Sequence, residues 1–392
     1  MIFDNHKNML LKINYDFIFP KMKILVIQQK MIGDVLTCSV LLEILRQNFP
    51  QAQLDYLINN NTYAVVKNNP FIDNFILLNP EKDKGFVSIR KLGKKLEQEN
   101  YDIVIDAYSK ISSNLLSYYS KAKTRISFQK WYSDFLYTHT YPRQHTAKTI
   151  AGLAIENRMS LLNPLLKKNE LGVPPRIYLT QEEIDKAKSY LQKNNLLLTQ
   201  PIFMISVLGS SPKKTYPQEY MANLINILVD TLDNVQILFN YMPHQFEQAQ
   251  AIYQSCSPSA QSKIRLDIYG NTLRDFMAIT WFCDAIIGNE GGAINIGKAL
   301  GKKTFSIFSP WIEQENWSIF EDGINNDSVH LKDYFPELYK NILEKKLKKK
   351  SIQLYKRLEP SLFKEKYRRF LLNIQKKNID IKGSNFTSIP PS

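Results

Sequence analysis

The 392-residue sequence has few of the residues that build disulfide frameworks or metal sites. Its three cysteines, Cys38, Cys256 and Cys283, lie in dissimilar contexts and form no C-x-x-C pair, so we expect buried thiols in a reducing compartment. The sequence also lacks an H-E-x-x-H motif, a defensible Ser-His-Asp order and any acidic cluster that would require a metal. Zinc-dependent and serine-triad hydrolases are therefore disfavoured, and no metal site is expected.

Long apolar runs are also missing. None approaches the ~18–20 residues that a membrane span needs. The N-terminal stretch, with Asp4, His6 and a broken apolar run, makes a poor signal peptide. We therefore expect a cytoplasmic protein. A hydrophobic content of 44% is typical of folded globular chains, and the length suits two domains.

A net excess of positive charge is nearly absent outside the C-terminal segment. Between Lys340 and Lys377 there are fourteen Lys and Arg against three Glu, which supplies +11 of the formal net charge of +14. The rest of the chain is close to neutral overall. This distribution indicates a basic tail and disfavours a nucleic-acid partner.

Two series of alternating strands and helices predict an α/β protein with two Rossmann-like domains. The paired prolines Pro174 and Pro175 mark the linker. We expect an extension over 1–21, a first domain over 22–170, a second domain over 171–335, and basic helices with a tail over 336–392. Ligands of such domains bind at the carboxyl ends of the strands. The predicted strands are 23–27, 54–58, 75–78, 101–107, 124–128, 202–207, 235–239, 264–268, 285–287 and 304–308.

The stretch 283–301, CDAIIGNEGGAINIGKALG, has the pattern of a buried strand, a glycine-rich turn and a helix start. Gly291 and Gly292 would expose backbone N–H groups and the positive end of the helix dipole, which suits a phosphate group. The turn is neither G-x-G-x-x-G nor a P-loop. An ordinary strand-to-helix turn in any α/β protein remains an alternative.

Further polar residues follow other predicted strands. Asp34, after the first strand, could be a helix N-cap or a general base. Ser210, Ser211 and Lys214, in GSSPKKTYP, suit a phosphate-bearing ligand, and a solvated loop is the alternative. The loop 240–244 offers a place for a base or a sugar.

These segments resemble the bacterial lipopolysaccharide heptosyltransferase family, glycosyltransferase family nine, which has the GT-B fold. The resemblance rests on KILVIQQKMIGDVLTCSVLLEILRQNFP, GSSPKKTYPQEY and GNEGGAINIGKALG, in that order, and on the strand, helix and Arg125 of YDIVIDAYSKISSNLLSYYSKAKTRISF. It implies two Rossmann-like domains facing a central cleft, with the C-terminal helix returning to the first domain. It also implies that Asp34 is the catalytic base and that Lys214 holds the donor diphosphate.

The resemblance implies further donor and acceptor residues. Glu290 and Gly291 depart from the family's usual N-D-T-G-P-x-H loop, as does Asn295 at the place of its histidine. Arg125 is a candidate acceptor contact. His145 is a further candidate from its place on a loop before a helix, and a surface histidine without such a role is the alternative. The expected donor-binding residues are Ser210, Ser211, Lys214, Asn289, Glu290, Gly291, Gly292, Ala293 and Asn295.

We therefore expect an inverting glycosyltransferase. It would use a nucleotide-diphosphate-sugar donor, ADP-linked by resemblance, with no metal required, and a lipopolysaccharide-core or related glycolipid acceptor. A nucleotide-sugar epimerase and a non-catalytic nucleotide-sugar or carbohydrate-binding protein remain alternatives. The apolar stripe of Phe363, Tyr367, Phe370 and Leu371 predicts a helix packed on the body of the protein. The cations of this basic tail would hold the protein peripherally on an anionic membrane, at the inner face of the cell membrane.

Overall fold

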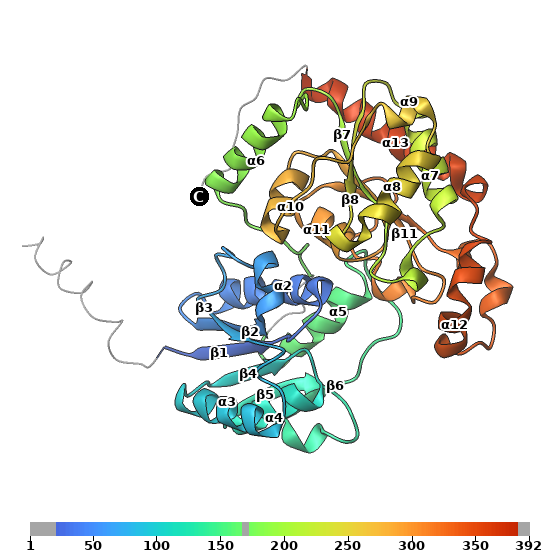
Figure 1. The fold of residues 1–392 in the computed structure, drawn as a ribbon. Coiled ribbons are helices and arrows are strands. Elements are labelled where there is room, and N and C mark those ends of the chain that lie inside the picture. Colours follow the sequence, from blue (N-terminus) through green and yellow to red (C-terminus); the bar gives the residue numbers. More distant parts are fainter. Residues whose placement is uncertain (1–20, 167–171, 383–392) are drawn as a thin grey trace, which may run out of the picture.

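Two six-stranded parallel sheets, one in each domain, form the framework of the protein (Figure 1). The computed structural model describes residues 21–166 and 172–382, with side chains up to Ile374. The strand order is β3-β2-β1-β4-β5-β6 in the first sheet and β12-β11-β10-β7-β8-β9 in the second. These sheets confirm the predicted α/β fold. The expected extension lies outside the described residues except for Lys21.

All ten predicted strands are present, although β9 is shorter than expected, and two further strands were not predicted. The first sheet contains β1 (Lys23–Ile27), β2 (Gln53–Asn59), β3 (Asn74–Leu78), β4 (Ile103–Asp106), β5 (Thr124–Phe128) and β6 (His139–Tyr141). The second contains β7 (Ile202–Ser206), β8 (Gln236–Asn240), β9 (Ile264–Arg265), β10 (Ala285–Asn289), β11 (Lys303–Ile307) and β12 (Asn326–Val329). The unpredicted strands, β6 and β12, are the edge strands at one end of each sheet.

Helices cover both faces of the first sheet. Side chains alternate across β1, so that Ile24 and Val26 face one apolar cluster and Leu25 and Ile27 the other. The first cluster includes α2 (Ile32–Asn48) and α5 (Leu153–Met159), and the second includes residues of α3 (Phe86–Gln98) and α4 (Ile111–Tyr119). Both faces of these strands are therefore apolar, as a buried parallel sheet requires.

The second sheet is covered in the same way. One face carries α10 (Leu273–Thr280) and α11 (Gly292–Ala299). The other carries α7 (Gln218–Thr231), α8 (Phe246–Ser255) and α9 (Pro258–Gln261). Unlike these helices, α6 (Gln181–Lys193) lies between the domains in sequence and packs on α10.

The C-terminal helices pack on the second domain (Figure 1). They are α12 (Glu344–Tyr355) and α13 (Pro360–Lys382), and α13 contacts α7 and β11. The Phe305 ring of β11 lies 5.0 Å from the Tyr367 ring and 5.4 Å from the Phe370 ring, centroid to centroid. The predicted inward stripe is confirmed. The expected return to the first domain is wrong, because the stripe meets Phe305 and α7 in the second domain.

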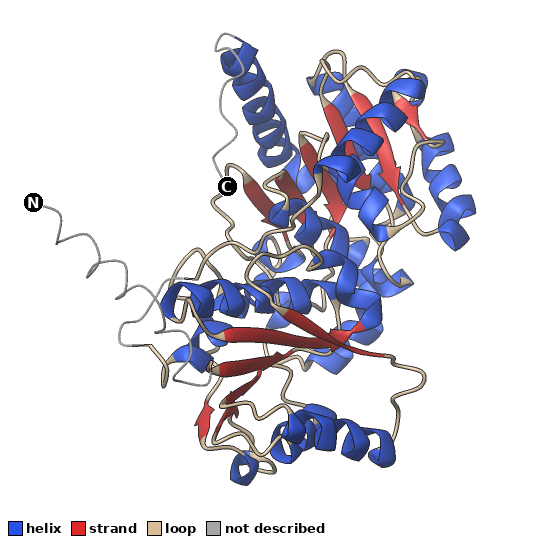
Figure 2. Cartoon of the chain, turned by 90° about the vertical axis from the view of Figure 1, so that its left-hand side faces the viewer, coloured by secondary structure: helices blue, strands red, loops and turns tan. Residues whose placement is uncertain are grey.

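The two domains are in direct contact, as the cartoon in Figure 2 also shows. One buried apolar cluster includes α2 of the first domain and α10 and α11 of the second. Polar contacts add to it, because Arg274 of α10 donates to the carbonyls of Ala64 and Tyr178 and pairs with Glu183 of α6. Domain docking therefore buries apolar surface and also uses a charged clamp.

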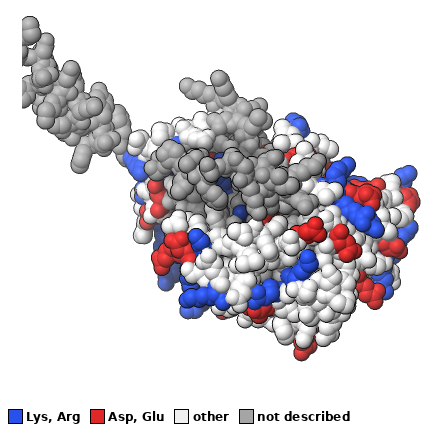
Figure 3. Space-filling model, turned by 90° about the horizontal axis from the view of Figure 1, so that it is seen from above, with Lys and Arg blue, Asp and Glu red and all other residues white. Residues whose placement is uncertain are grey.

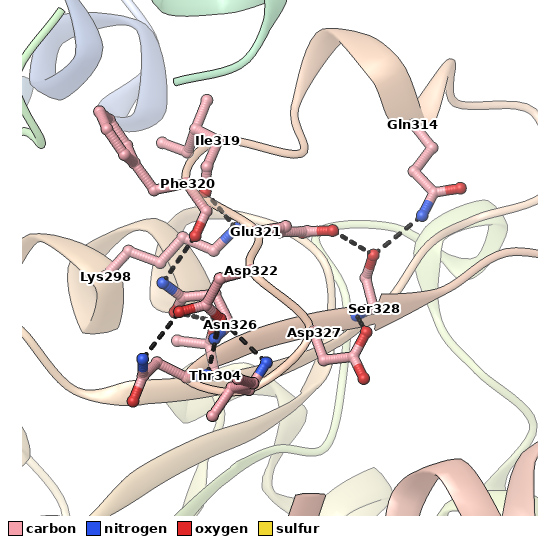
Figure 4. A network of polar contacts seen from close by, with 12 residues as sticks. Lys298, Thr304, Gln314, Ile319, Phe320, Glu321, Asp322, Asn326, Asp327 and Ser328 are labelled. Carbon is pink, nitrogen blue, oxygen red and sulfur yellow. Dashed lines mark hydrogen bonds and ion pairs between the residues drawn. The ribbon is translucent and has the colours of Figure 1, made fainter. Parts of the chain in front are cut away.

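A polar network braces the segment that returns from β11 to the first domain (Figure 4). Lys298 of α11 donates to the Ile319 carbonyl at 3.0 Å and pairs with Glu321 at 3.1 Å. Asn326 donates to the Phe320 carbonyl, and the Phe320 N–H donates to the Ile150 carbonyl of the first domain. The network thus ties α11 to the domain contact. Within residues 21–166 and 172–382, no helix is both long and apolar enough to cross a bilayer.

Candidate active site

The glycine-containing turns after β1 and β10 meet across the domain contact. Each turn follows a strand at the point where the strand order of its sheet reverses, between β1 and β4 and between β10 and β7. A Cβ added at Gly33 would lie 2.8 Å from Asn295 Nδ2, and one at Gly292 would lie 3.8 Å from the Ile32 side chain. Ligands of doubly wound sheets bind at such points. The arrangement brings the predicted base turn and the predicted donor turn together.

Asp34 lies in the first turn of α2 and pairs with Arg158 of α5. Its Oδ1 accepts a hydrogen bond from Arg158 Nη2 at 2.6 Å. The Arg158 side chain is only 8% exposed, whereas that of Asp34 is 26% exposed. The N-cap is Met31, which makes no side-chain capping bond, so the N-cap alternative for Asp34 is wrong. The buried guanidinium fixes a carboxylate that still reaches solvent.

Arg158 was not predicted. It lies in a part of the sequence with no motif, 124 residues from Asp34. Its Nη1 donates to the Ala154 carbonyl at 2.7 Å, one turn earlier in α5, which fixes the side chain in place. Only the packing of α5 on α2 reveals the pair.

Lys214 and Glu290 form the charged part of the donor turn. Lys214 Nζ lies 3.7 Å from Glu290 Oε2, and the two side chains are 27% and 10% exposed. Burial raises the pKa of the Glu290 carboxyl, while Lys214 and Lys298 act in the opposite direction. Glu290 Oε2 accepts no hydrogen bond from the described residues. An ammonium group and a nearly buried carboxylate therefore flank the N-terminus of α11.

The backbone around α11 requires glycine at two positions. Gly288 has φ +127°, and a Cβ there would lie 2.4 Å from the Ser206 carbonyl oxygen. Gly291, the N-cap of α11, has φ +154°, and no atom of the described residues lies within 4 Å of the position of an added Cβ. The first glycine permits close packing of β10 on β7, and the second leaves open space in front of the helix. Ala293 is partly exposed in the first turn of α11.

The buried side chain of Asn289 supports the turn between β10 and α11. Its Nδ2 donates to the Ser206 carbonyl at 2.8 Å, and its Oδ1 accepts from the Tyr216 N–H at 2.7 Å. The residue is 1% exposed. The expectation that Asn289 contacts the donor is therefore corrected, because its side chain holds the donor turn against β7. Asn295 is likewise 7% exposed and faces Gly33.

The loop that carries Lys214 is held by the C-terminal helix α12. Ser351 and Ser309 both donate to the Lys213 carbonyl, at 2.7 and 2.6 Å. Lys348 Nζ lies 4.3 Å from the Trp311 ring centroid, and Lys214 Nζ lies 5.7 Å from the same centroid. Ser210 and Ser211 are exposed on this loop. Part of the basic segment therefore adjoins the donor turn, which the sequence did not reveal.

The first domain has a cavity of about 370 Å³ at the carboxyl edge of its sheet. Its lining includes Gln29 and Lys30 from the turn between β1 and α2, Asn59 at the end of β2, Lys84 before α3, and Ser112 of α4. Ser112 Oγ donates to Gln29 Oε1 at 2.8 Å. The cavity therefore combines hydroxyl, amide and ammonium groups, which can bind the polar groups of an acceptor.

Cationic side chains lie close to Asp34 on the same edge. The Arg143 guanidinium lies 3.7 Å from the Phe128 ring centroid. Although Arg143 as a whole is exposed, desolvation of its guanidinium, and then the positive charge of Arg158, lowers the pKa of Arg143, while Asp34 and Asp106 act to raise it. Lys130 Nζ donates to the Ser109 carbonyl after β4. This edge therefore suits an acceptor with anionic groups.

Of the two predicted acceptor residues, Arg125 lies elsewhere. It is near the start of β5, and its guanidinium donates to the carbonyls of Leu136 and Ala122 at 2.9 and 2.6 Å. The start of a parallel strand is opposite the ligand edge, so this prediction is corrected. His145 is exposed on the loop between β6 and α5 and stays a prediction. In the 240–245 region, Gln245 donates to the Gly209 carbonyl at 3.1 Å.

Comparisons with known proteins identify relatives over most of the chain. Lipopolysaccharide heptosyltransferase 1 of Campylobacter coli is 21% identical over 310 residues, which is 78% of this chain and 88% of that protein. Lipopolysaccharide heptosyltransferase 2 of Escherichia coli K12 is 22% identical over 297 residues, which is 74% of this chain and 83% of that protein. The chain therefore spans most of both relatives.

Solved structures show the same fold. The E. coli ADP-heptose lipopolysaccharide heptosyltransferase II matches with a TM-score of 0.64 at 17% identity, covering 92% of this chain and 100% of that one. A family 9 glycosyl transferase from Veillonella parvula matches with a TM-score of 0.65 at 16% identity, covering 85% and 97%. These likenesses confirm the GT-B arrangement.

A sequence profile assigns the family. The profile described as glycosyltransferase family 9 (heptosyltransferase) matches residues 89–331, more than half of the chain. This range contains Lys214, Glu290 and all of the second sheet. The protein is therefore an enzyme of the glycosyltransferase class and belongs to glycosyltransferase family 9.

Proposed function

We propose that this enzyme transfers a sugar, a heptose or a similar one, from an ADP-linked donor to a lipopolysaccharide-core or related glycolipid acceptor, with inversion. One observation carries the proposal. The turn with Asp34 in the first domain meets the turn with Lys214, Glu290 and the α11 N-terminus in the second. A proton acceptor and a diphosphate-binding group thus lie on the two sides of one domain contact. The names of the relatives support the acceptor class.

In the proposed reaction, Asp34 removes the proton from an acceptor hydroxyl. The hydroxyl oxygen attacks the anomeric carbon from the side opposite the diphosphate, and the bond from that carbon to the leaving oxygen breaks. Arg158 holds the carboxylate at 2.6 Å and so orients it. The nucleoside diphosphate leaves with its added negative charge, which the Lys214 ammonium and the α11 N–H groups stabilise.

Glu290 positions Lys214 before the donor binds. The 3.7 Å separation is longer than a tight ion pair, and Lys214 keeps part of its surface exposed. When the donor binds, its diphosphate oxygens can pair with the Lys214 ammonium in place of the Glu290 carboxylate. The Glu290 carboxylate, freed from this pairing, can accept hydrogen bonds from hydroxyl groups of the sugar or ribose.

The acceptor would bind at the carboxyl edge of the first sheet. The cavity lined by Gln29 and Ser112 adjoins the turn that holds Asp34. Arg143 and Lys130 would pair with carboxylate or phosphate groups of a lipopolysaccharide core. We further propose that the enzyme works at the inner face of the cell membrane, with the basic C-terminal segment attracted to anionic lipid.

Incubation with candidate donors, with and without acceptor, tests the function. A transferase releases nucleoside diphosphate only in step with glycosylated acceptor. An epimerase would convert the donor sugar without acceptor, and a binding protein would leave it unchanged; either result would refute the proposal. Thermal-shift screening with ADP-, UDP-, GDP- and CDP-sugars identifies the nucleotide, since a ligand at 100 times its Kd adds about 2.7 kcal/mol of stability.

A further inference from the structure

Three large apolar side chains of the first domain are strongly exposed. Trp131 is 91% exposed, Phe135 is 80% exposed and Ile111 is 70% exposed. The first two belong to the connection between β5 and β6, which includes η2 (Asp134–Leu136), and Ile111 begins α4, which η2 contacts. We call Trp131 and Phe135, together with the aliphatic Ile111, the aromatic patch. Exposed groups of large apolar side chains commonly mark interaction sites.

The connection that carries the patch is firmly held. The Lys130 N–H donates to Asp134 Oδ1 at 2.7 Å, and Lys130 Nζ donates to the Ser109 carbonyl. At the other end, the Tyr137 hydroxyl lies 2.6 Å from Asp106 Oδ2. One end is therefore anchored to the loop after β4 and the other to the last residue of β4, while Trp131 and Phe135 are exposed. The aromatic side chains are presented to solvent by a fixed backbone.

The surroundings of the patch are basic. Residues 106–156 contain seven Lys and Arg and three acidic residues. Asp106 is fully buried, Asp134 accepts the bond from the Lys130 N–H, and Glu156 accepts bonds from the Lys148 and Thr149 N–H groups. Lys110, Lys121 and Lys123 are exposed. By contrast, the face seen from above in Figure 3 carries acidic and basic side chains interspersed. Lys110 directly precedes Ile111 of the patch, and Lys121 and Lys123 follow the other end of α4, which η2 contacts.

We propose that the aromatic patch and its exposed lysines bind the surface of an anionic phospholipid bilayer. Trp and Phe side chains partition into the interface between headgroups and acyl chains, and lysines lie at the level of the anionic headgroups. A second copy of this chain fits less well, because two surfaces of the same positive charge would meet. Charge complementarity therefore favours lipid.

This contact would present the candidate acceptor edge to the membrane. Lys130 links the patch to Ser109, which follows β4 at the same carboxyl edge as Arg143 and the cavity. A glycolipid acceptor could then reach Asp34 without leaving the bilayer. The patch is separate from α12, so it is a second attachment surface. It does not depend on which sugar is transferred.

Vesicle co-sedimentation of the full chain tests the proposal, with phosphatidylethanolamine–phosphatidylglycerol vesicles as the probe. The double variant Trp131→Ser/Phe135→Ser should bind about tenfold or more weakly, because two apolar side chains no longer leave water. The matched control Leu197→Ser/Ile324→Ser replaces side chains of the second domain that are 53% and 56% exposed, and should bind as the wild type does. Thermal unfolding of each variant confirms the fold.

Two further measurements separate insertion from simple charge attraction. Brominated acyl chains should quench the wild-type tryptophan emission, and Trp131→Phe should abolish most of that quenching while binding persists. Neutralising Lys110, Lys121 and Lys123 to Gln should weaken binding to anionic vesicles.

The proposal is overturned if Trp131→Ser/Phe135→Ser binds vesicles as tightly as the wild type. It is also overturned if the emission is not quenched. A lipid-free dimer that this variant abolishes would assign the patch to a second copy instead.

Discussion

The Lys214–Glu290 pair allows binding and stability to be separated in one experiment. Lys214→Met removes the ammonium and retains the approximate length of the side chain. The Glu290 carboxylate, whose side chain is only 10% exposed, then lacks its nearest cation. Removing one partner of a fully buried pair costs about 3–5 kcal/mol. The 3.7 Å separation and the 27% exposure of Lys214 reduce our expectation to about 1–2 kcal/mol. For domains of 150–250 residues, this lowers Tm by about 2–8 °C.

The decrease in Tm caused by Lys214→Met should depend on pH in a defined direction. Burial raises the pKa of Glu290 above its ordinary value of 4.5, and the removal of Lys214 raises it further. When the pKa of a carboxyl is higher in the folded than in the unfolded state, its contribution to stability is fully present below the pKa of the unfolded state. This contribution is lost as the pH rises through the pKa of the folded state. The difference in Tm between wild type and variant should therefore be largest at pH 7–8 and close as the pH falls toward 4.5.

The double variant Lys214→Met/Glu290→Gln should recover Tm, because no carboxylate is left unpaired. It should still fail to bind nucleoside diphosphate in calorimetry, because the ammonium is absent. Lys213→Met, which removes an exposed neighbouring lysine, should change neither quantity. Recovery of nucleotide binding in the double variant would refute the assignment of Lys214 to the donor. An unchanged Tm in Lys214→Met at pH 8 would refute the stability argument.

Three other changes test separate parts of the structure. Asp34→Asn should keep nucleotide binding by calorimetry and lose product formation, since an amide cannot take up the proton; full activity would exclude Asp34 as the base. Arg274→Met should lower Tm at neutral pH, because Arg274 holds the pKa of Glu183 at about 2. That contribution is present above pH 4.5 and fades as the pH falls toward 2, and a Tm loss independent of pH would contradict it. Neutralising the exposed lysines of α12 should reduce binding to anionic vesicles at low salt without unfolding, and binding indifferent to both salt and these residues would end the electrostatic proposal. They are Lys345, Lys346, Lys348, Lys349 and Lys350.

The sequence predicted the elements with strong local patterns. Continuous apolar runs identified β1 and β10, which are buried on both faces. The edge strands were missed because their residues lack that pattern: β6 is three partly exposed residues, and β12 reads Asn-Asp-Ser-Val. The helix α6 was also missed, because it buries only Ala187 and Leu191, although Thr180 and Glu183 form a capping box at its N-terminus.

The candidate site was predictable only in its turns. Asp34, Lys214 and the glycines of α11 follow strand ends, and a sheet of known direction places such residues at one edge. Arg158 and Trp311 belong to the site only through their contacts with Asp34 and Lys214, which are distant in sequence. No local sequence pattern predicts such contacts. The stripe on α13 showed that the helix packs, but Phe305 of the second domain determines where.

The apolar cluster shared by the two domains also affects how the chain folds during synthesis. It extends from Ile24 of β1 to Ile319, near the contact with Ile150. A ribosome releases α2 long before it has made α11, the helix that covers part of it. Chains usually fold domain by domain from the N-terminus, and apolar surface that waits for a later partner is prone to aggregate. We therefore expect the nascent first domain to be prone to aggregation until the second domain covers this surface.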